Sequence, residues 1–146
     1  MSWIYKDEVI TSLQQVPEKA IGFVYEVTQI STGKKYIGKK SLYSYRTLPP
    51  LKGQKRKRKV VKESDWLKYF GSQSDLKALV KENKHDFERE ILEFAFTKKS
   101  LTYLENKYLF SKGVIEPGSI YFNDNIEGRY FKKDFYEADQ DTPGDE

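Results

Sequence analysis

Cysteine is absent from this 146-residue chain, and histidine occurs once, as His85. The absence of cysteine excludes disulfides, thiol nucleophiles and cysteine-containing zinc sites. A single histidine cannot form a multi-histidine metal cluster, so any metal bound here would be held by oxygen atoms. His85 lies in the polar stretch 82–86, which predicts a surface position rather than a catalytic one.

Long hydrophobic runs are also missing. No run approaches the length that crosses a bilayer, and residues 1–19 contain no apolar core of signal-peptide length. We therefore expect no membrane partner and a cytoplasmic location. The chain also lacks the glycine-rich phosphate-binding patterns and the G-x-S-x-G motif, which argues against nucleotide-binding proteins and serine hydrolases.

The charge of the chain is unevenly distributed. Residues 137–146 hold five Asp or Glu and no Lys or Arg, so residues 1–136 carry +9 of a total net charge of +4. We expect one domain over residues 1–136, followed by a mobile acidic tail over 137–146. A basic body in a chain that is 15% aromatic favours a polyanion such as nucleic acid over an anionic membrane surface.

Residue patterns predict a mixture of strands and helices. An ordered lead-in over 1–19 precedes a β-hairpin, whose strands 21–28 and 33–39 are joined by the turn 29–32. A third strand is predicted over 87–96. Ser64, Ser74 and Ser100 are expected to cap helices, the first ending before Gly71 and the last running over 101–112 until Gly113 stops it. Two short aromatic segments, 117–122 and 130–135, follow.

A basic insertion at about 46–63 interrupts this pattern. Its Pro49, Pro50 and Gly53 predict a long exposed loop. In most proteins such a run is a solvated loop or a localisation patch, but in a basic body it favours contacts with a phosphate backbone. The candidate nucleic-acid-binding residues are Lys40, Lys52, Lys55, Arg56, Lys57, Arg58, Lys59 and Lys62.

Two tyrosines are expected to share one face of the hairpin. A four-residue turn at 29–32 sets Tyr25 opposite Tyr36 and Phe23 opposite Gly38, where the missing side chain leaves open space. Val24 and Ile37 then point the other way, toward a core. Cross-strand tyrosine pairs are common, so this pair alone favours a structural role.

Glu105 lies on or beside the buried stripe of the predicted helix 101–112. Burying an unpaired carboxylate costs several kcal/mol, so it needs a cation, a donor or a metal. The simplest alternative is a helix-flank glutamate paired with Lys107 or Lys112.

Together these residues resemble the GIY-YIG endonuclease family. Its two short motifs read here as Gly-Phe-Val-Tyr at 22–25 and Tyr-Ile-Gly at 36–38, with the tyrosines eleven residues apart. Arg46 follows ten residues after the second tyrosine, Glu105 lies in the later helix, and Asn123 follows in Tyr-Phe-Asn. Segments 69–72 and 86–92 are similar to those of phage-type and homing members, so the resemblance covers about 22–123.

The resemblance implies an α+β fold with a small three-stranded antiparallel sheet flanked by helices. It also implies DNA cleavage with one Mg²⁺ or Mn²⁺ held by Glu105. Arg46 would clamp the phosphate and Tyr25 would position and deprotonate the attacking water, with Lys39, Arg46 and the metal lowering the pKa of its phenol from about 10. Tyr36 would support the water or the phosphate, and Asn123 completes the family's catalytic set.

Two functions remain open on this basis. The first is a metal-dependent DNA endonuclease, and the second is a basic nucleic-acid-binding module that keeps the fold without cutting. For the enzyme, the segments flanking 22–123 are too short for a separate sequence-reading domain, so we expect nicking with low specificity. Double-strand cleavage would need two protomers or two successive events, and a phage-encoded protein would act in the host cytoplasm.

Overall fold

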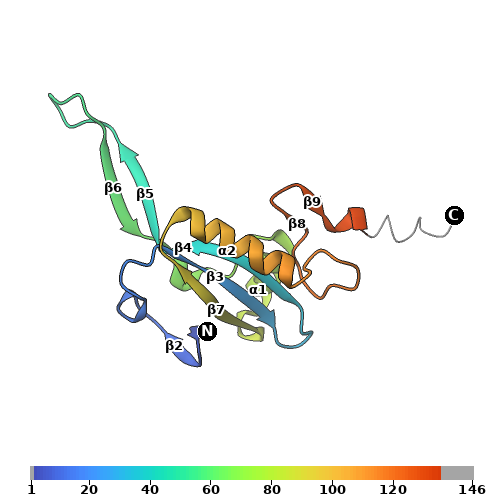
Figure 1. Ribbon diagram of the computed structural model, residues 1–146. Coiled ribbons are helices and arrows are strands. Elements are labelled where there is room, and N and C mark those ends of the chain that lie inside the picture. The colour runs from blue at the N-terminus through green and yellow to red at the C-terminus, as the bar shows by residue number, and fades with distance from the viewer. Residues whose placement is uncertain (1, 136–146) are drawn as a thin grey trace.

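The computed structural model describes residues 2–135, so the predicted acidic tail at 137–146 lies outside the described residues. The centre of the fold is strand β3 (Gly22–Gln29), which pairs antiparallel with β4 (Lys35–Ser41) on one side and with β7 (Phe87–Ala95) on the other (Figure 1). These are the three strands that the sequence predicted.

The sheet is larger than predicted because the lead-in joins it. Strands β1 (Trp3–Tyr5) and β2 (Glu8–Ile10) extend the order to β2-β1-β7-β3-β4. Strand β1 runs parallel to β7, so the sheet is mixed and has five strands, and the expected three-stranded antiparallel sheet is wrong on both points. Burial explains the addition, since Trp3 is fully buried and its indole N–H donates to the Trp66 carbonyl at 2.7 Å.

Helices cover both faces of the sheet. Helix α2 (Lys98–Ser111) packs its Leu101 and Leu109 against Val24 and Ile37, which point away from the tyrosines as predicted. The opposite face, to which Trp3 and Ile10 of the N-terminal strands contribute, packs against helix α1 (Ser74–Glu82) and the one-turn helix η2 (Trp66–Lys68). The one-turn helix η3 (Lys84–Asp86) lies between α1 and β7 in the chain. A further turn, η1 (Leu13–Gln15), follows β2. None of the helices in residues 2–135 is both long and apolar enough to cross a membrane.

The three predicted serine caps are wrong. Ser64 donates its hydroxyl to the Ser41 carbonyl at 2.6 Å, and the segment after it forms only the single turn η2. Gln73 caps α1 by accepting from the Leu76 amide at 2.7 Å. Helix α2 starts three residues earlier than predicted because Thr97 is its cap, with Ser100 as the reciprocal partner in a capping box.

The basic insertion is a β-hairpin rather than a loop. Strands β5 (Tyr43–Leu48) and β6 (Arg58–Glu63) pair antiparallel and extend away from the body of the domain (Figure 1). Tyr43 and Tyr45 on one strand and Val60 and Val61 on the other have high strand propensity, which explains the pairing. The prolines and Gly53 lie in the connecting segment 49–57, and the insertion is exposed as expected.

The register of the β3–β4 hairpin differs from the prediction. The turn lies one residue later, since the Gln29 amide donates to the Lys34 carbonyl at 2.8 Å. Tyr25 therefore pairs with Gly38 and Tyr36 with Val27. A shift of two residues in the pairing leaves both tyrosines on one face, but the predicted open space at Gly38 is filled by the Tyr25 phenol.

The chain after α2 returns to the open edge of the sheet. The Lys35 amide donates to the Ile120 carbonyl at 3.0 Å, and the Phe122 amide donates to the Lys35 carbonyl at 2.6 Å. The predicted aromatic segment 117–122 thus meets the start of β4. Beyond it, β8 (Asn125–Ile126) pairs with β9 (Tyr130–Phe131), which lies within the second aromatic segment.

Gly38→Ala should lower the free energy of unfolding by roughly 1–3 kcal/mol, the usual cost of overpacking a filled core. A Cβ at Gly38 would lie 2.5 Å from the Tyr25 hydroxyl oxygen and 2.8 Å from its Cζ atom. Urea denaturation measures the difference. In a Tyr25→Phe background Gly38→Ala should lower the free energy of unfolding by a smaller amount. An equal loss in both backgrounds would show that the clash with the Tyr25 hydroxyl does not cause the destabilisation.

Candidate active site

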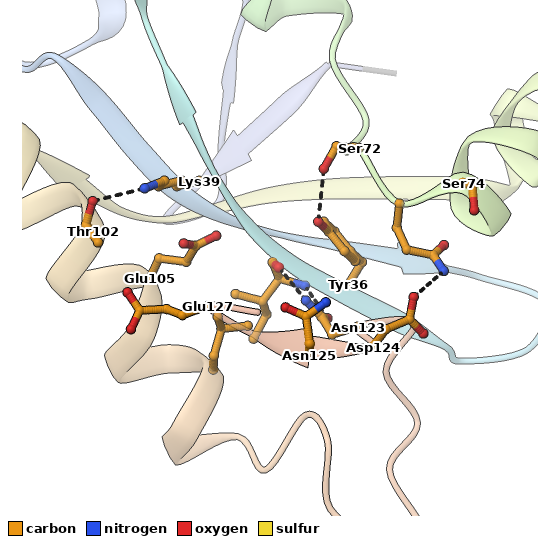
Figure 2. Close-up of a pocket in the computed structure, with 13 residues that line it drawn as sticks. Tyr36, Lys39, Ser72, Ser74, Thr102, Glu105, Asn123, Asp124, Asn125 and Glu127 are labelled. Atoms are coloured by element: carbon orange, nitrogen blue, oxygen red, sulfur yellow. Dashed lines mark hydrogen bonds between the residues drawn. The ribbon is translucent and has the colours of Figure 1, made fainter. Parts of the chain in front are cut away.

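A groove of about 580 Å³ lies along the open edge of the sheet. Its walls come from β4, from α2, from the segment that precedes α1 and from residues 123–127 (Figure 2). Because β4 is an edge strand, side chains from both of its faces reach the groove. Tyr36 enters from one face and Lys39 from the other.

The Asn123 side chain forms hydrogen bonds with the backbone of this edge strand. Its side-chain oxygen accepts from the Ile37 amide at 3.0 Å, and its side-chain nitrogen donates to the Ile37 carbonyl at 2.8 Å. The side chain is 6% exposed, so both bonds lie in the interior. Asn123 thus supplies the donor and acceptor that a neighbouring strand would otherwise supply, and it turns residues 124–127 into the groove.

Tyr36 is the phenol at the groove surface. Its hydroxyl lies 3.3 Å from the Ser72 hydroxyl, on the segment just before α1. Burial raises the pKa of Tyr36, and the Ser72 hydrogen bond opposes that rise. Tyr36 therefore stays protonated at neutral pH and presents a hydroxyl that can donate to or accept from a ligand.

Tyr25 lies behind Tyr36 rather than in the groove. It is 1% exposed, with its ring centroid 6.2 Å from that of Tyr36, 6.0 Å from Tyr69 and 5.4 Å from Trp3. Burial raises the pKa of Tyr25 well above its usual range, and nearby Tyr36, Tyr69 and Glu105 raise it further. The expected lowering of this pKa by Lys39 and Arg46 is therefore wrong, since both the burial and the charges around the phenol act the other way.

Glu105 projects from α2 into the groove. Burial raises the pKa of its carboxyl group and Glu127 raises it further, while the Lys39 ammonium and backbone amide oppose the rise. Lys39 also donates to the Thr102 hydroxyl at 2.9 Å, one turn before Glu105 (Figure 2). Because the pKa is raised on folding, ionised Glu105 reduces the stability of the metal-free fold as pH rises above the group's ordinary value of 4.5.

The alternative ion pairs for Glu105 do not form. Within residues 2–135 the ion pairs are Lys35–Glu26 and Lys40–Asp65, so the helix-flank pairing with Lys107 or Lys112 is not adopted. Lys40, a predicted nucleic-acid-binding residue, instead holds Asp65 at 2.6 Å and lies 4.2 Å from the Tyr69 ring centroid.

The groove suits a hard divalent cation. Asp124, Glu105 and Glu127 line it together with a single cation, Lys39, so it carries an excess of negative charge. No cluster of three or more His, Cys, Asp or Glu suited to a metal ion occurs among residues 2–135. A cation here would therefore use one or two carboxylates together with water and substrate oxygens, which is the pattern that Mg²⁺ prefers.

Arg46 does not lie in the groove. It is exposed on β5, paired with Val60 in the hairpin. The remaining predicted nucleic-acid-binding residues, Lys52 to Lys62, lie on the same exposed hairpin, and His85 is exposed in η3 as expected.

Several groove residues were not predicted. Ser72 and Gln73 come from the segment before α1, where Gln73 donates to Asp124 at 3.2 Å across the groove. Asp124 follows Asn123 directly and Glu127 lies four residues after it, so the largely polar run beginning at Asn123 was the signal that could have identified them.

Comparison with protein families gives one match. The family described as "Putative endonuclease segE, GIY-YIG domain" matches residues 3–126. The chain belongs to the GIY-YIG endonuclease family. A search of curated proteins and a search of solved structures each find no match.

Membership of the GIY-YIG family implies nuclease activity in general terms. The match begins at β1 and ends at β8, so its span includes the N-terminal strands, the basic hairpin and the groove residues up to Asn125, while Glu127 lies just beyond it. The hairpin thus lies within the span of residues that the GIY-YIG family matches.

Asn123→Asp should destabilise this GIY-YIG domain by about 1–3 kcal/mol, because a carboxylate oxygen would replace the donor to the Ile37 carbonyl. Asn125→Asp is the matched control, since it keeps the oxygen that accepts from the Gly128 amide at 2.9 Å. Thermal unfolding followed by circular dichroism compares them. Equal stability of the two variants would show that the Ile37 pairing contributes nothing.

Proposed function

We propose that this GIY-YIG protein is a divalent-metal-dependent endonuclease that hydrolyses DNA phosphodiester bonds. The observation that carries the proposal is the meeting of Glu105, Lys39 and Tyr36 in one groove at the sheet edge. A carboxylate for a metal, a cation for a phosphate and a phenol for a water molecule are together able to promote phosphodiester hydrolysis.

Glu105 is the residue that would hold Mg²⁺ or Mn²⁺, with Glu127 close enough to influence its charge. When bound, the metal would act as a Lewis acid toward the scissile phosphate and the leaving oxygen. Its positive charge would also offset the carboxylates of the groove, which otherwise oppose the approach of a polyanion.

The remaining groove residues orient the reactants. Lys39, held by Thr102, offers an ammonium group for a phosphate oxygen in the place where Arg46 was expected. The Tyr36 hydroxyl, held by Ser72, can orient the attacking water. Tyr25, whose pKa is raised, stays protonated and supports the Tyr36 ring from the core. This role takes the place of the expected one, in which Tyr25 deprotonates the attacking water.

The proposal includes nicking with low sequence specificity. One groove handles one strand at a time, so a double-strand break requires two copies of the chain or two successive events. A non-catalytic DNA-binding module is the second candidate, and the position of Arg46 outside the groove favours it.

Glu105→Gln should lower the rate of plasmid cleavage by about a hundredfold or more, because the substitution removes the charged metal ligand. The assay follows supercoiled plasmid with Mg²⁺, with Mn²⁺ and with a chelator. Nicked circles should accumulate before linear molecules, with the nicks at many positions.

The matched control for this experiment is Glu90→Gln, an exposed glutamate on β7 outside the groove, which should cut at the wild-type rate. Cleavage by Glu105→Gln at the rate of the control would show that Glu105 is not part of the active site. DNA binding without cleavage by the wild type under all metal conditions would favour the non-catalytic module.

A further inference from the structure

The β5–β6 hairpin is the most exposed structural element of the domain. All six residues of β6 and four of the six in β5 are exposed, and the hairpin stands clear of the sheet and helices (Figure 1). Isolated two-stranded hairpins are only marginally stable in water, so contact with a partner would stabilise this element.

Charge identifies the kind of partner. Residues 43–63 contain eight Lys or Arg and one Glu, a net charge of +7 in a chain whose total is +4, so the rest of the chain carries −3. The hairpin is therefore the part of the protein that attracts a polyanion, whereas the charged residues that line the groove are three carboxylates and one lysine. Two such hairpins would repel one another, which disfavours a second copy of this chain as the occupant.

The two faces of the hairpin are chemically different. One face includes Tyr43, which packs against the core, and Tyr45, whose ring centroid lies 5.2 Å from the Lys98 ammonium at the start of α2. This face is turned toward the body of the domain. The opposite face, called here the outer face, carries three cations and no acid. Its cross-strand pairs are Ser44 with Lys62, Arg46 with Val60, and Leu48 with Arg58.

We propose that the β5–β6 hairpin is a two-stranded ribbon that enters the major groove of B-form duplex DNA with its outer face against the base edges. Lysines and arginines of the connecting segment 49–57 then contact the flanking phosphates. The inference rests on the proposed function for its substrate and deepens it, since it specifies the duplex form and the surface that receives it.

The dimensions of the hairpin agree with this arrangement. Six strand residues span roughly 20 Å at about 3.3 Å per residue. The major groove of B-DNA, about 12 Å wide and 8.5 Å deep, admits a two-stranded ribbon, whereas the major groove of A-form RNA is too narrow.

The outer face also offers side-chain types that contact base edges, and so small a set of base contacts is compatible with nicking at many positions. Arg46 and Arg58 can each donate two hydrogen bonds to a guanine edge. Val60, which is opposite Arg46 and two residues from Arg58 on β6, can contact a thymine methyl group. Val60 is 37% exposed, so the methyl contact is available without any rearrangement.

The test compares DNA binding by two full-length triple variants that lose the same charge. The outer-face variant is Arg46→Gln with Arg58→Gln and Lys62→Gln, and the loop variant is Lys52→Gln with Lys55→Gln and Lys57→Gln. Fluorescence anisotropy with a mixed-sequence DNA duplex is measured in chelator, where no cleavage occurs, and circular dichroism confirms that both variants are folded. We expect the outer-face variant to bind about tenfold more weakly than the loop variant.

A second duplex tests the groove without any variant. Bulky groups on the C5 atoms of its pyrimidines fill the major groove and leave the phosphates free, so the wild type should bind it about tenfold more weakly, in line with lost base contacts. A duplex of RNA should also bind more weakly. Equal losses in the two triple variants, or unchanged affinity for the C5-substituted duplex, would overturn the inference, as would preference for the RNA duplex or for an acidic polypeptide.

Plasmid cleavage by the wild type separates this inference from the proposed function. A protein that cuts plasmid yet shows equal losses in the two variants is a nuclease whose hairpin contacts only the backbone. If the protein shows the expected binding pattern and never cuts plasmid, the inference about the hairpin holds and the proposed endonuclease function is wrong.

Discussion

The open edge of β4 is the feature on which the groove depends. An edge strand has a row of amides and carbonyls without a neighbouring strand, and Asn123 bonds both backbone groups of Ile37 from a loop. At Ile37 the edge therefore has no backbone group free to pair with a further strand. Side chains from both faces of β4 can still meet in the groove. Tyr36 comes from the aromatic face, and Lys39 comes from the face that α2 covers. A central strand could not bring these groups into one groove.

The groove and the β5–β6 hairpin carry net charges of opposite sign. The charged residues of the groove are three carboxylates and Lys39, and burial raises the pKa of Glu105. The metal-free site is therefore unfavourable both for ionised Glu105 and for a phosphate. The hairpin carries the opposite charge. In the proposed mechanism the hairpin supplies affinity for DNA and the groove supplies the cation-dependent chemistry. Binding and cutting then respond to different substitutions, as the proposed Glu105 and hairpin variants would reveal.

Local patterns predicted the elements better than their arrangement. The strand β3 follows from its β-branched and aromatic residues, and the strand β7 was also predicted. The stop of α2 at Gly113 was predicted from the glycine itself, which adopts a φ of 58°. The lead-in strands were missed because their turn uses Lys6 and Asp7, both at positive φ, in place of the usual Asn-Gly. The register was missed by two residues because the seating of Tyr25 over Gly38 is a three-dimensional packing constraint. The meeting of Glu105 with Tyr36 and Lys39 was predicted only through the family motifs. No local sequence pattern predicts it, because β4 and α2 are far apart in the chain.

Titration of ¹⁵N-labelled protein with Mg²⁺, followed by backbone amide chemical shifts, tests the central claim most directly. The protein has a second group of carboxylates, Glu26, Glu88 and Glu90, on a surface hollow away from the groove, which serves as an internal comparison. Saturable shifts at Lys39 and around Glu105, absent in Glu105→Gln, are the predicted result. Shifts confined to Glu88 and Glu90, or unchanged shifts at Lys39 in the wild type, would contradict a metal site in the groove.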